Sequence, residues 1–165
     1  MEEPAMRRFS LALGTVPLIL ALSAAPVGAA AGGIGHTVTI TQHQHGEFTI
    51  PDAINPCNGH VIAIAVNGNS VQHITFFPDG DEVWMTFTTT GKFTGIDGNV
   101  TYTGHFTVWG NFNLNERNSN STFTFSLRAF GSDGSVIVGH ETAHFTMNAN
   151  GTVTVSFDKM TFTCG

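Results

Sequence analysis

Two neighbouring stretches decide the fold, VWMTFTTTGKFT (residues 83–94) and NVTYTGHFTVWG (residues 99–110), joined by the short segment GIDG. Each stretch alternates threonine with aromatic or aliphatic residues, and alternation with a period of two is typical of a half-buried β-strand. With 95–98 as the loop of a hairpin, Phe87 is expected opposite Phe106. One face of the hairpin is then apolar and the other is rich in threonine, and a shift of one residue would mix the two faces.

The same pattern continues in both directions along the chain, without helix signals beyond the N-terminal segment. Nine strands are expected between clusters of Gly, Asn and Asp: 36–41, 46–50, 60–67, 71–77, 83–94, 99–114, 121–130, 137–147 and 152–163. The sequence therefore predicts an all-β fold, an antiparallel meander of eight or nine strands. A closed barrel with an apolar interior is favoured because closure removes unpaired sheet edges, and a β-sandwich is the alternative. An outer-membrane barrel would invert this pattern.

The last predicted hairpin places two charges on the apolar face. With Ala149–Gly151 as its loop, Glu141 falls opposite Lys159. A charge on an inward face is costly unless it is paired, so the two are expected in contact near the barrel mouth. If they line a cavity with Tyr102, they are candidates for ligand orientation or acid–base chemistry. The favoured alternative is a bulge at Gly139, which would turn Glu141 outward and leave an ordinary surface pair.

The N-terminal segment is predicted to direct export. Arg7 and Arg8 precede an apolar stretch from Phe9 to Ala25, and small residues follow it, as in a cleavable signal peptide. We expect residues 1–31 to be this signal peptide and residues 32–165 to be a single β domain. The mature protein is then secreted and extracellular, without membrane insertion, and an uncleaved anchor is the alternative.

Two cysteines remain in the exported part of the chain, Cys57 and Cys164. In an oxidising compartment they are expected to form one disulfide, which ties the last strand to the turn at Asn55–Gly59. In the chain-entropy model, a closed loop of about 108 residues stabilises the fold by about 4–5 kcal/mol. Catalysis by a cysteine is therefore not expected.

Charge and aromatic content limit the partners. Beyond residue 31 the cations are only Lys92, Arg117, Arg128 and Lys159, and the net charge of the chain is −6. Scattered cations do not make the basic face that nucleic acid or anionic lipid requires. Thirteen phenylalanines beyond residue 31 against one tyrosine indicate a filled core. The expected partner is a small lipophilic ligand or another protein, and no cofactor is expected.

Two histidine motifs resemble metal sites. HETAH (residues 140–144) matches the H-E-x-x-H zinc motif, which works on a helix, where positions i and i+4 share a face. Its neighbours here are β-branched and aromatic, and on a strand the two histidines would stand about 13 Å apart, too far for one zinc ion. His43 and His45 share a strand face with Glu47, but the sequence offers no further ligand. Exposed or hydrogen-bonded histidines are therefore favoured at both places.

Trp84 and Trp109 are the remaining candidates for a binding site. The hairpin register makes them cross-strand neighbours on the threonine-rich face, close to His105. Large aromatic side chains on a polar outer face mark a contact site more often than chance. The alternative is that a segment such as Gln42–Pro56 covers them.

Several blocks together resemble a family of secreted actinobacterial proteins for which no activity is known. The blocks are Asn55-Pro56-Cys57, Tyr102–Gly110, Thr122–Phe125, Gly131–Ser135, His144–Thr146, Val153–Phe157 and Cys164-Gly165. The resemblance implies export, the disulfide, a β-barrel and a bacterial host, in which the sequons at Asn99, Asn120 and Asn150 would be idle. It implies no catalytic or binding residue.

The predicted function is that of a secreted β-barrel that binds a ligand or a partner without catalysis. No G-x-S-x-G elbow, facing acid pair or phosphate-binding loop can be identified. The alternatives are a small barrel enzyme of the cyclase or isomerase type that uses a buried acid, and a structural cell-surface protein.

Overall fold

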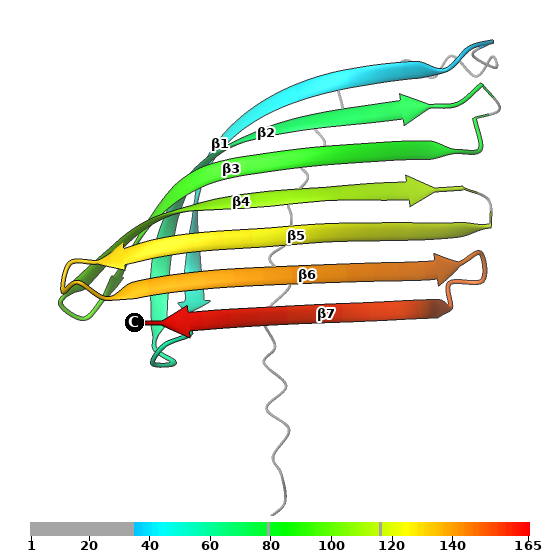
Figure 1. Ribbon diagram of the computed structural model, residues 1–165. Coiled ribbons are helices and arrows are strands. Elements are labelled where there is room, and N and C mark those ends of the chain that lie inside the picture. Colours follow the sequence, from blue (N-terminus) through cyan, green and yellow to red (C-terminus); the bar gives the residue numbers. More distant parts are fainter. Residues whose placement is uncertain (1–34, 79, 116) are drawn as a thin grey trace, which may run out of the picture. The chain divides into compact units, whose positions relative to one another are not determined.

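The computed structural model describes residues 35–78, 80–115 and 117–165, which form one antiparallel sheet of seven strands in chain order (Figure 1). The strands are β1 (Val38–Ile54), β2 (Val61–Phe76), β3 (Val83–Asp97), β4 (Val100–Leu114), β5 (Asn118–Gly131), β6 (Val136–Asn148) and β7 (Val153–Cys164). The predicted all-β antiparallel meander is confirmed. The predicted signal peptide, residues 1–31, lies outside the described residues.

The predicted strand count of eight or nine is wrong, because two expected breaks do not occur. β1 runs through Gln42–His45, and β2 runs through the polar segment Asn67–Ser70. Gly68 lies in the middle of β2, opposite Gly46 of β1 and Gly91 of β3. A Cβ atom at Gly68 would lie 3.2 Å from the carbonyl oxygen of Thr90. This glycine therefore permits a close approach of backbones inside a strand rather than a turn.

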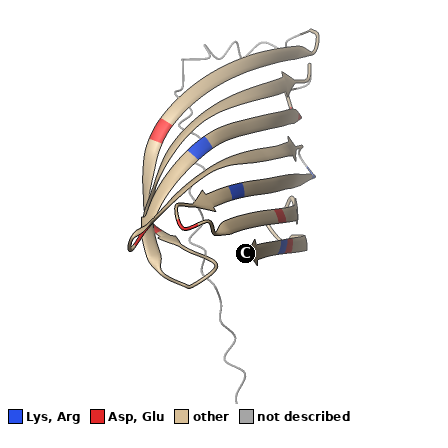
Figure 2. Cartoon of the chain, turned by 60° about the vertical axis from the view of Figure 1, so that its left-hand side comes forward, with Lys and Arg blue, Asp and Glu red and all other residues tan. Residues whose placement is uncertain are grey.

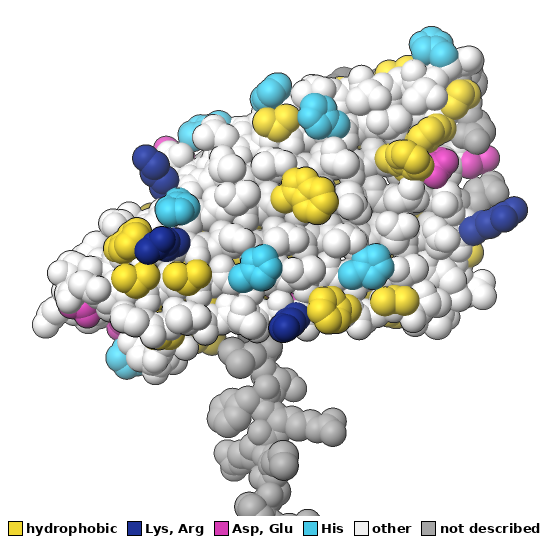
Figure 3. All heavy atoms as spheres, in the orientation of Figure 1, with side chains coloured by type: hydrophobic (Ala, Val, Ile, Leu, Met, Phe, Trp, Pro, Cys, Tyr) yellow, Lys and Arg dark blue, Asp and Glu magenta, His cyan; other side chains and the backbone are white. Residues whose placement is uncertain are grey.

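The sheet has two chemically distinct faces. We call the inner face the one that carries Phe93, Tyr102, Phe106, Leu127 and Ile137, and the outer face the one that carries Thr88, Thr103, Thr107, Trp109 and Thr124. β1, β2 and β3 bend strongly towards the inner face, which lies inside the curve (Figure 1). The outer face is mostly polar and uncharged, with separate histidine and apolar side chains (Figure 3). The predicted division into an apolar and a threonine-rich face is confirmed.

The predicted register of the central hairpin is wrong by four residues. The turn consists of Gly98 and Asn99 alone, and Asp97 pairs with Val100. Gly98 has a φ of +59°, which suits the first position of a two-residue II′ hairpin turn. Since the shift is an even number of residues, every side chain keeps its predicted face while its partner changes.

Phenylalanine rings lie over glycines of the neighbouring strand on the inner face. The pairs are Phe106 with Gly91, Phe93 with Gly104, Phe87 with Gly110, and Phe162 with Gly139. A Cβ atom added to any of these glycines would lie 2.5–2.6 Å from a ring carbon. The rings thus occupy the space that a second row of side chains would fill, and the strands can bend towards this face.

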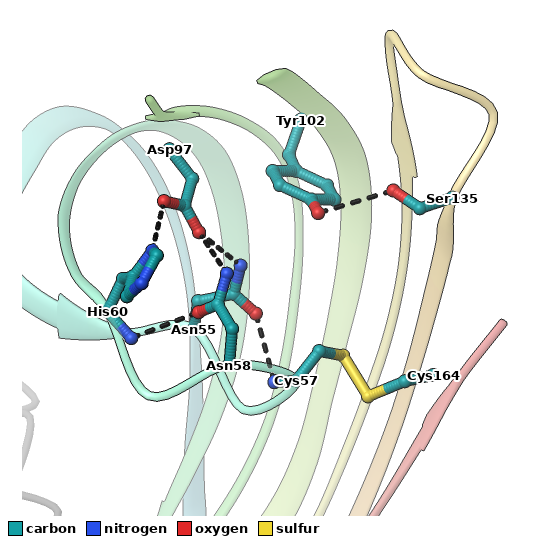
Figure 4. The surroundings of a disulfide bond; sticks show 8 residues. All are labelled: Asn55, Cys57, Asn58, His60, Asp97, Tyr102, Ser135 and Cys164. Carbon is teal, nitrogen blue, oxygen red and sulfur yellow. Dashed lines mark hydrogen bonds and ion pairs between the residues drawn. A yellow bond between two sulfur atoms is a disulfide. The ribbon is translucent and has the colours of Figure 1, made fainter. Parts of the chain in front are cut away.

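One end of the sheet is fastened by the disulfide between Cys57 and Cys164 (Figure 4). The two Cα atoms are 5.8 Å apart, as a disulfide requires, and the predicted bond is confirmed. It joins the turn between β1 and β2 to the end of β7. Gly165 continues the ladder beyond it, since its N–H donates to the carbonyl of Val136 at 3.0 Å.

Asp97, at the end of β3, holds the same turn through hydrogen bonds (Figure 4). Its carboxylate accepts from the side-chain amides of Asn55 and Asn58, each at 2.7 Å, and lies 2.7 Å from Nδ1 of His60. These bonds, led by that of Asn58, lower the pKa of Asp97 to about 2. The turn between β1 and β2 is therefore anchored both to β3 and to β7.

The sheet is not closed into a barrel by hydrogen bonds, because β1 and β7 do not pair within the described ranges. Both strands run towards the disulfide, so any pairing between them would be parallel. At the other end of the sheet they remain free edges.

Gly104→Ala should lower the free energy of unfolding by about 1–3 kcal/mol, because overpacking in a filled position has this cost. Its Cβ would lie 2.5 Å from both the Phe93 ring and the carbonyl oxygen of Arg128. Gly46→Ala is the matched control, since it lies on the same face with no atom within 4 Å, and should change stability by less than about 0.5 kcal/mol. Urea unfolding of both variants measures the difference, and equal stabilities would contradict the ring-over-glycine packing.

The Cys57→Ser/Cys164→Ser variant should lose about 4 kcal/mol of unfolding free energy. The bond spans a sequence separation of 107 residues, and long loops gain most from closure in the chain-entropy model. Urea midpoints of the variant and of the oxidised protein test this. The same midpoint for both would show that the fastening of this end does not depend on the bond.

Candidate functional site

The inner face is the first candidate site, because its apolar side chains are incompletely covered. Only four apolar residues are buried in the described part of the chain: Val66, Tyr102, Ala129 and Ile137. Phe48 on β1 is 52% exposed, and Leu114, Phe145 and Phe162 on the same face are also exposed. Apolar side chains exposed along one face of a sheet make that face a candidate interaction or ligand surface.

Two carboxyl groups interrupt this apolar surface. Glu141 on β6 pairs with Met160, and the neighbouring Ala143 pairs with Asp158 on β7. Glu141 and Asp158 are therefore diagonal neighbours on the inner face, where cross-strand side chains interact.

The predicted pair of Glu141 and Lys159 is wrong. Lys159 pairs with Thr142 and lies on the outer face. The cause is a bulge between Thr146 and Met147, which shifts β7 by one residue and exchanges its faces. No bulge occurs at Gly139, so Glu141 stays on the inner face.

The surroundings of Glu141 disfavour its charged form. Burial raises the pKa of Glu141, and the negative charge and hydrogen bond of Asp158 raise it further. A carboxyl group that keeps its proton can donate a hydrogen bond to a polar group of a ligand on this face. It could also act as a general acid.

Tyr102, the third residue expected near this pair, lies elsewhere. Its ring is buried at the fastened end, and its Oη is 3.2 Å from Oγ of Ser135 (Figure 4). On β4 the residue level with Glu141 is Val108, through Phe125. Six residues of strand separate it from Tyr102, about 20 Å. Tyr102 therefore belongs to the core and not to the acid site.

Trp84 and Trp109 share the outer face, as predicted, but are not cross-strand partners. Trp84 pairs with Asn113, and Trp109 pairs with Thr88. Trp84, 49% exposed, packs edge-on against Phe77 at 5.0 Å between ring centroids.

The surroundings of the two indoles differ. Trp84 donates a hydrogen bond from Nε1 to Oε1 of Glu82 at 2.6 Å. Trp109 is 50% exposed and has neither a hydrogen bond nor an aromatic neighbour in the described residues. The segment Gln42–Pro56 covers neither, because it forms most of β1 at the edge of the sheet. The two indoles are equally exposed, but Trp84 is held by Phe77 and Glu82, whereas Trp109 has no such side-chain partner among the described residues.

His105 lies on the outer face between two cations, Lys92 and Arg128. The sequence suggested scattered cations, and only the register of three strands brings these two together. The sequence does not predict this row, because amino-acid composition does not determine the register between β4 and β5.

The HETAH motif lies on β6, so the strand prediction is confirmed. His140 hydrogen-bonds to Ser126 at 3.1 Å and His144 to Thr122 at 2.7 Å. His45 hydrogen-bonds to Asn69 at 3.1 Å. Among the residues that the structure describes, no group of three or more His, Cys, Asp or Glu could hold a metal ion.

Glu141→Gln should stabilise the protein at pH 7 by about 0.2–1 kcal/mol, because it removes a charge that lies beside the like charge of Asp158 on the neighbouring strand. The folded state raises the pKa of Glu141 above its ordinary 4.5, so the wild type loses stability as the pH rises through the folded pKa. The gain of the variant should disappear near pH 4, where Glu141 is protonated. Thermal unfolding between pH 4 and 7 tests this, and Asp158→Asn should give a gain that is not additive with it. A variant that is less stable at pH 7 than at pH 4, relative to wild type, would contradict the assignment.

Comparison with known proteins assigns no relative, since no family model, curated protein or solved structure matches this chain. The described residues contain no helix long and apolar enough to cross a membrane. The function must therefore be argued from the two faces of the sheet.

Proposed function

We propose that the protein is a secreted binding module that holds an apolar ligand against its inner face and catalyses no reaction. The observation that carries this proposal is the incomplete cover of that face. A seven-stranded sheet with phenylalanine along its inner face would normally pack on a second layer. The described residues supply no second layer.

The curvature favours a small ligand over a second protein sheet. Sheets that pack face to face keep a layer of about 10 Å between them and follow each other's twist. The fastened end, where the disulfide draws the turn between β1 and β2 to β7, obstructs such a layer. A lipophilic molecule can follow the curved surface and lie over the Phe–Gly pairs, because no side chain projects from the glycine at these positions.

Closure of the predicted barrel belongs to the same proposal. β1 and β7 have free edges and are held together at one end only, so they could come together around a bound ligand. An eight-stranded barrel interior holds one small ligand, and seven strands leave a narrower one. Secretion is supported by the basic and apolar N-terminal sequence and by the disulfide, which oxidising compartments maintain.

A small enzyme that uses a buried acid is the second candidate. The specific observation in its favour is the raised pKa of Glu141 on an apolar surface. Perturbed carboxyl groups of this kind are frequent at active sites. A binding module needs the same group only to hydrogen-bond its ligand, so the two candidates differ in whether the ligand is converted.

The binding proposal is tested with the neutral probe N-phenyl-1-naphthylamine, whose fluorescence rises in apolar sites. Phe145→Ser should weaken its binding about tenfold, because one buried aromatic contact contributes about 1.4 kcal/mol. Phe157→Ser is the matched control, since Phe157 on the neighbouring strand is at least as exposed, 49% against 38% for Phe145, but faces outward opposite His144. It should change binding less than twofold.

Equal effects of both substitutions, or no probe binding, would contradict the proposal. Native mass spectrometry of protein from its own host should show a retained apolar ligand. Conversion of that ligand by the wild type but not by Glu141→Gln would favour the enzyme instead.

A further inference from the structure

The strand register places the cations and most of the acids of the strands on opposite faces of the sheet, and Figure 2 shows how few charged positions the strands carry. Lys92, Arg128 and Lys159 all lie on the outer face of β3, β5 and β7. Asp97, Glu141 and Asp158 lie on the inner face, Glu47 of β1 lies on the outer face, and Asp52 lies in the irregular part of β1 between Ile50 and Ala53. The outer face is therefore locally basic in a chain whose net charge is −6.

Lys92, His105 and Arg128 form a row across the adjacent strands β3, β4 and β5. Lys92 pairs with His105, and His105 pairs with Arg128, so the three are spaced by about 4.8 Å. All three are exposed. Figure 3 shows two basic side chains with a histidine close by on this face.

Contacts within the fold do not explain the row. Neither Lys92 nor Arg128 lies within 4.0 Å of a carboxylate of the described chain. Glu47, the acid in the same row, instead accepts a hydrogen bond from Asn67 at 2.5 Å and lies 3.8 Å from Nε2 of His45. Like charges in one row oppose folding.

Arg128 is oriented by its own strand. Its guanidinium lies over the Phe130 ring, 5.0 Å from the centroid. Such stacking holds the planar group in place while its N–H donors remain free for bidentate contacts with a carboxylate.

Hydroxyl groups and an open indole adjoin the row. The next row along the strands is Thr90, Thr107 and Ser126, and the one after it is Thr88, Trp109 and Thr124. A shallow depression in this region is lined by residues that include Asn67, Asn69, Thr90, Lys92, His105 and Thr107. Trp109 stands four residues from His105, about 13 Å along β4.

We propose that the outer face binds an acidic polysaccharide. Carboxylates of the sugar chain lie against Lys92, His105 and Arg128, and a sugar ring stacks on Trp109 across the hydroxyl row. Hydroxyl and amide side chains suit the hydrogen bonds of sugars, since they both donate and accept. The site is on the opposite face from the proposed apolar ligand and does not depend on it.

Other polyanions match this face less well. Nucleic acid is bound by a larger basic surface than two cations and one histidine. An anionic membrane attracts clusters of four or more Lys and Arg. A sugar polymer with spaced carboxylates needs only one such row together with an aromatic platform.

Binding of polygalacturonate at about 50 mM salt, measured by calorimetry, tests the proposal. Lys92→Gln/Arg128→Gln should weaken binding more than tenfold, and Trp109→Ala about tenfold, while Trp109→Phe keeps most of the affinity. Arg128→Gln alone should also weaken binding, and Arg117→Gln is its matched control, because it removes the same single charge from the turn between β4 and β5 and should change affinity less than twofold. Thermal unfolding of each variant shows whether it is folded. If Lys92→Gln/Arg128→Gln or Trp109→Ala does not fold, the comparison rests on the variants that do, including Trp109→Phe and Arg117→Gln.

Several results would overturn the proposal. They are no binding of polygalacturonate, equal binding of uncharged dextran, equal binding of poly-L-glutamate, or tighter binding of vesicles that contain phosphatidylglycerol. Equal losses for Arg117→Gln and for Arg128→Gln would also overturn it, because the effect would then follow net charge rather than the row.

Discussion

The curvature of the whole sheet depends on the fastening of one turn, the one between β1 and β2. In a seven-stranded meander this turn and the end of β7 lie at opposite edges, and sequential pairing alone does not bring them together. The disulfide makes the connection covalently. Asp97 adds a second attachment, in which a carboxylate only 8% exposed is surrounded by donors, and Asn55 beside it is 1% exposed. Because its pKa is lowered from 3.8 to about 2, its stabilising charge is present above pH 4 and is lost only as the pH falls towards 2.

Glycines give the strands the freedom that this curvature requires. Gly46, Gly68 and Gly91 stand opposite one another across β1, β2 and β3, the part of the sheet that bends most (Figure 1). On the inside of a bend, side chains crowd, and glycine at such positions permits tight bending. The ring of Phe106 covers Gly68 and Gly91 on the inner side, while the space beside Gly46 stays open. The alternation of glycine and phenylalanine on the inner face is thus the feature of the sequence that permits the curvature of the sheet.

The alternation of residues in the sequence predicts on which face each side chain lies, but it does not predict every cross-strand partner. Alternation from Val83 to Trp109 assigns each residue to a face, and a register error of four residues leaves that assignment intact. The choice between Gly95 and Gly98 as the turn depended on ring-over-glycine packing, which a pattern of apolar residues does not reveal. No glycine or proline in the sequence marks the bulge after Thr146. This bulge alone shifts the register so that Lys159 no longer lies opposite Glu141. Asp97 appeared to be an ordinary loop residue because its partners are distant in sequence. Only the disulfide followed from counting.

The stability of a fold that buries so little apolar surface depends in part on the ligand that it binds. Hydrophobic burial is normally the main favourable term in folding, yet here most inner-face side chains are only partly buried, and the disulfide limits the unfolded chain in addition. A ligand that binds only the folded state adds stability in proportion to the logarithm of its concentration. An apolar ligand on the inner face would therefore complete a core that the sheet lacks. The outer face needs no such completion, because threonine and asparagine remain hydrated there. The same alternation that builds the strands thus separates a face that requires a partner for its stability from one that can release its partner freely.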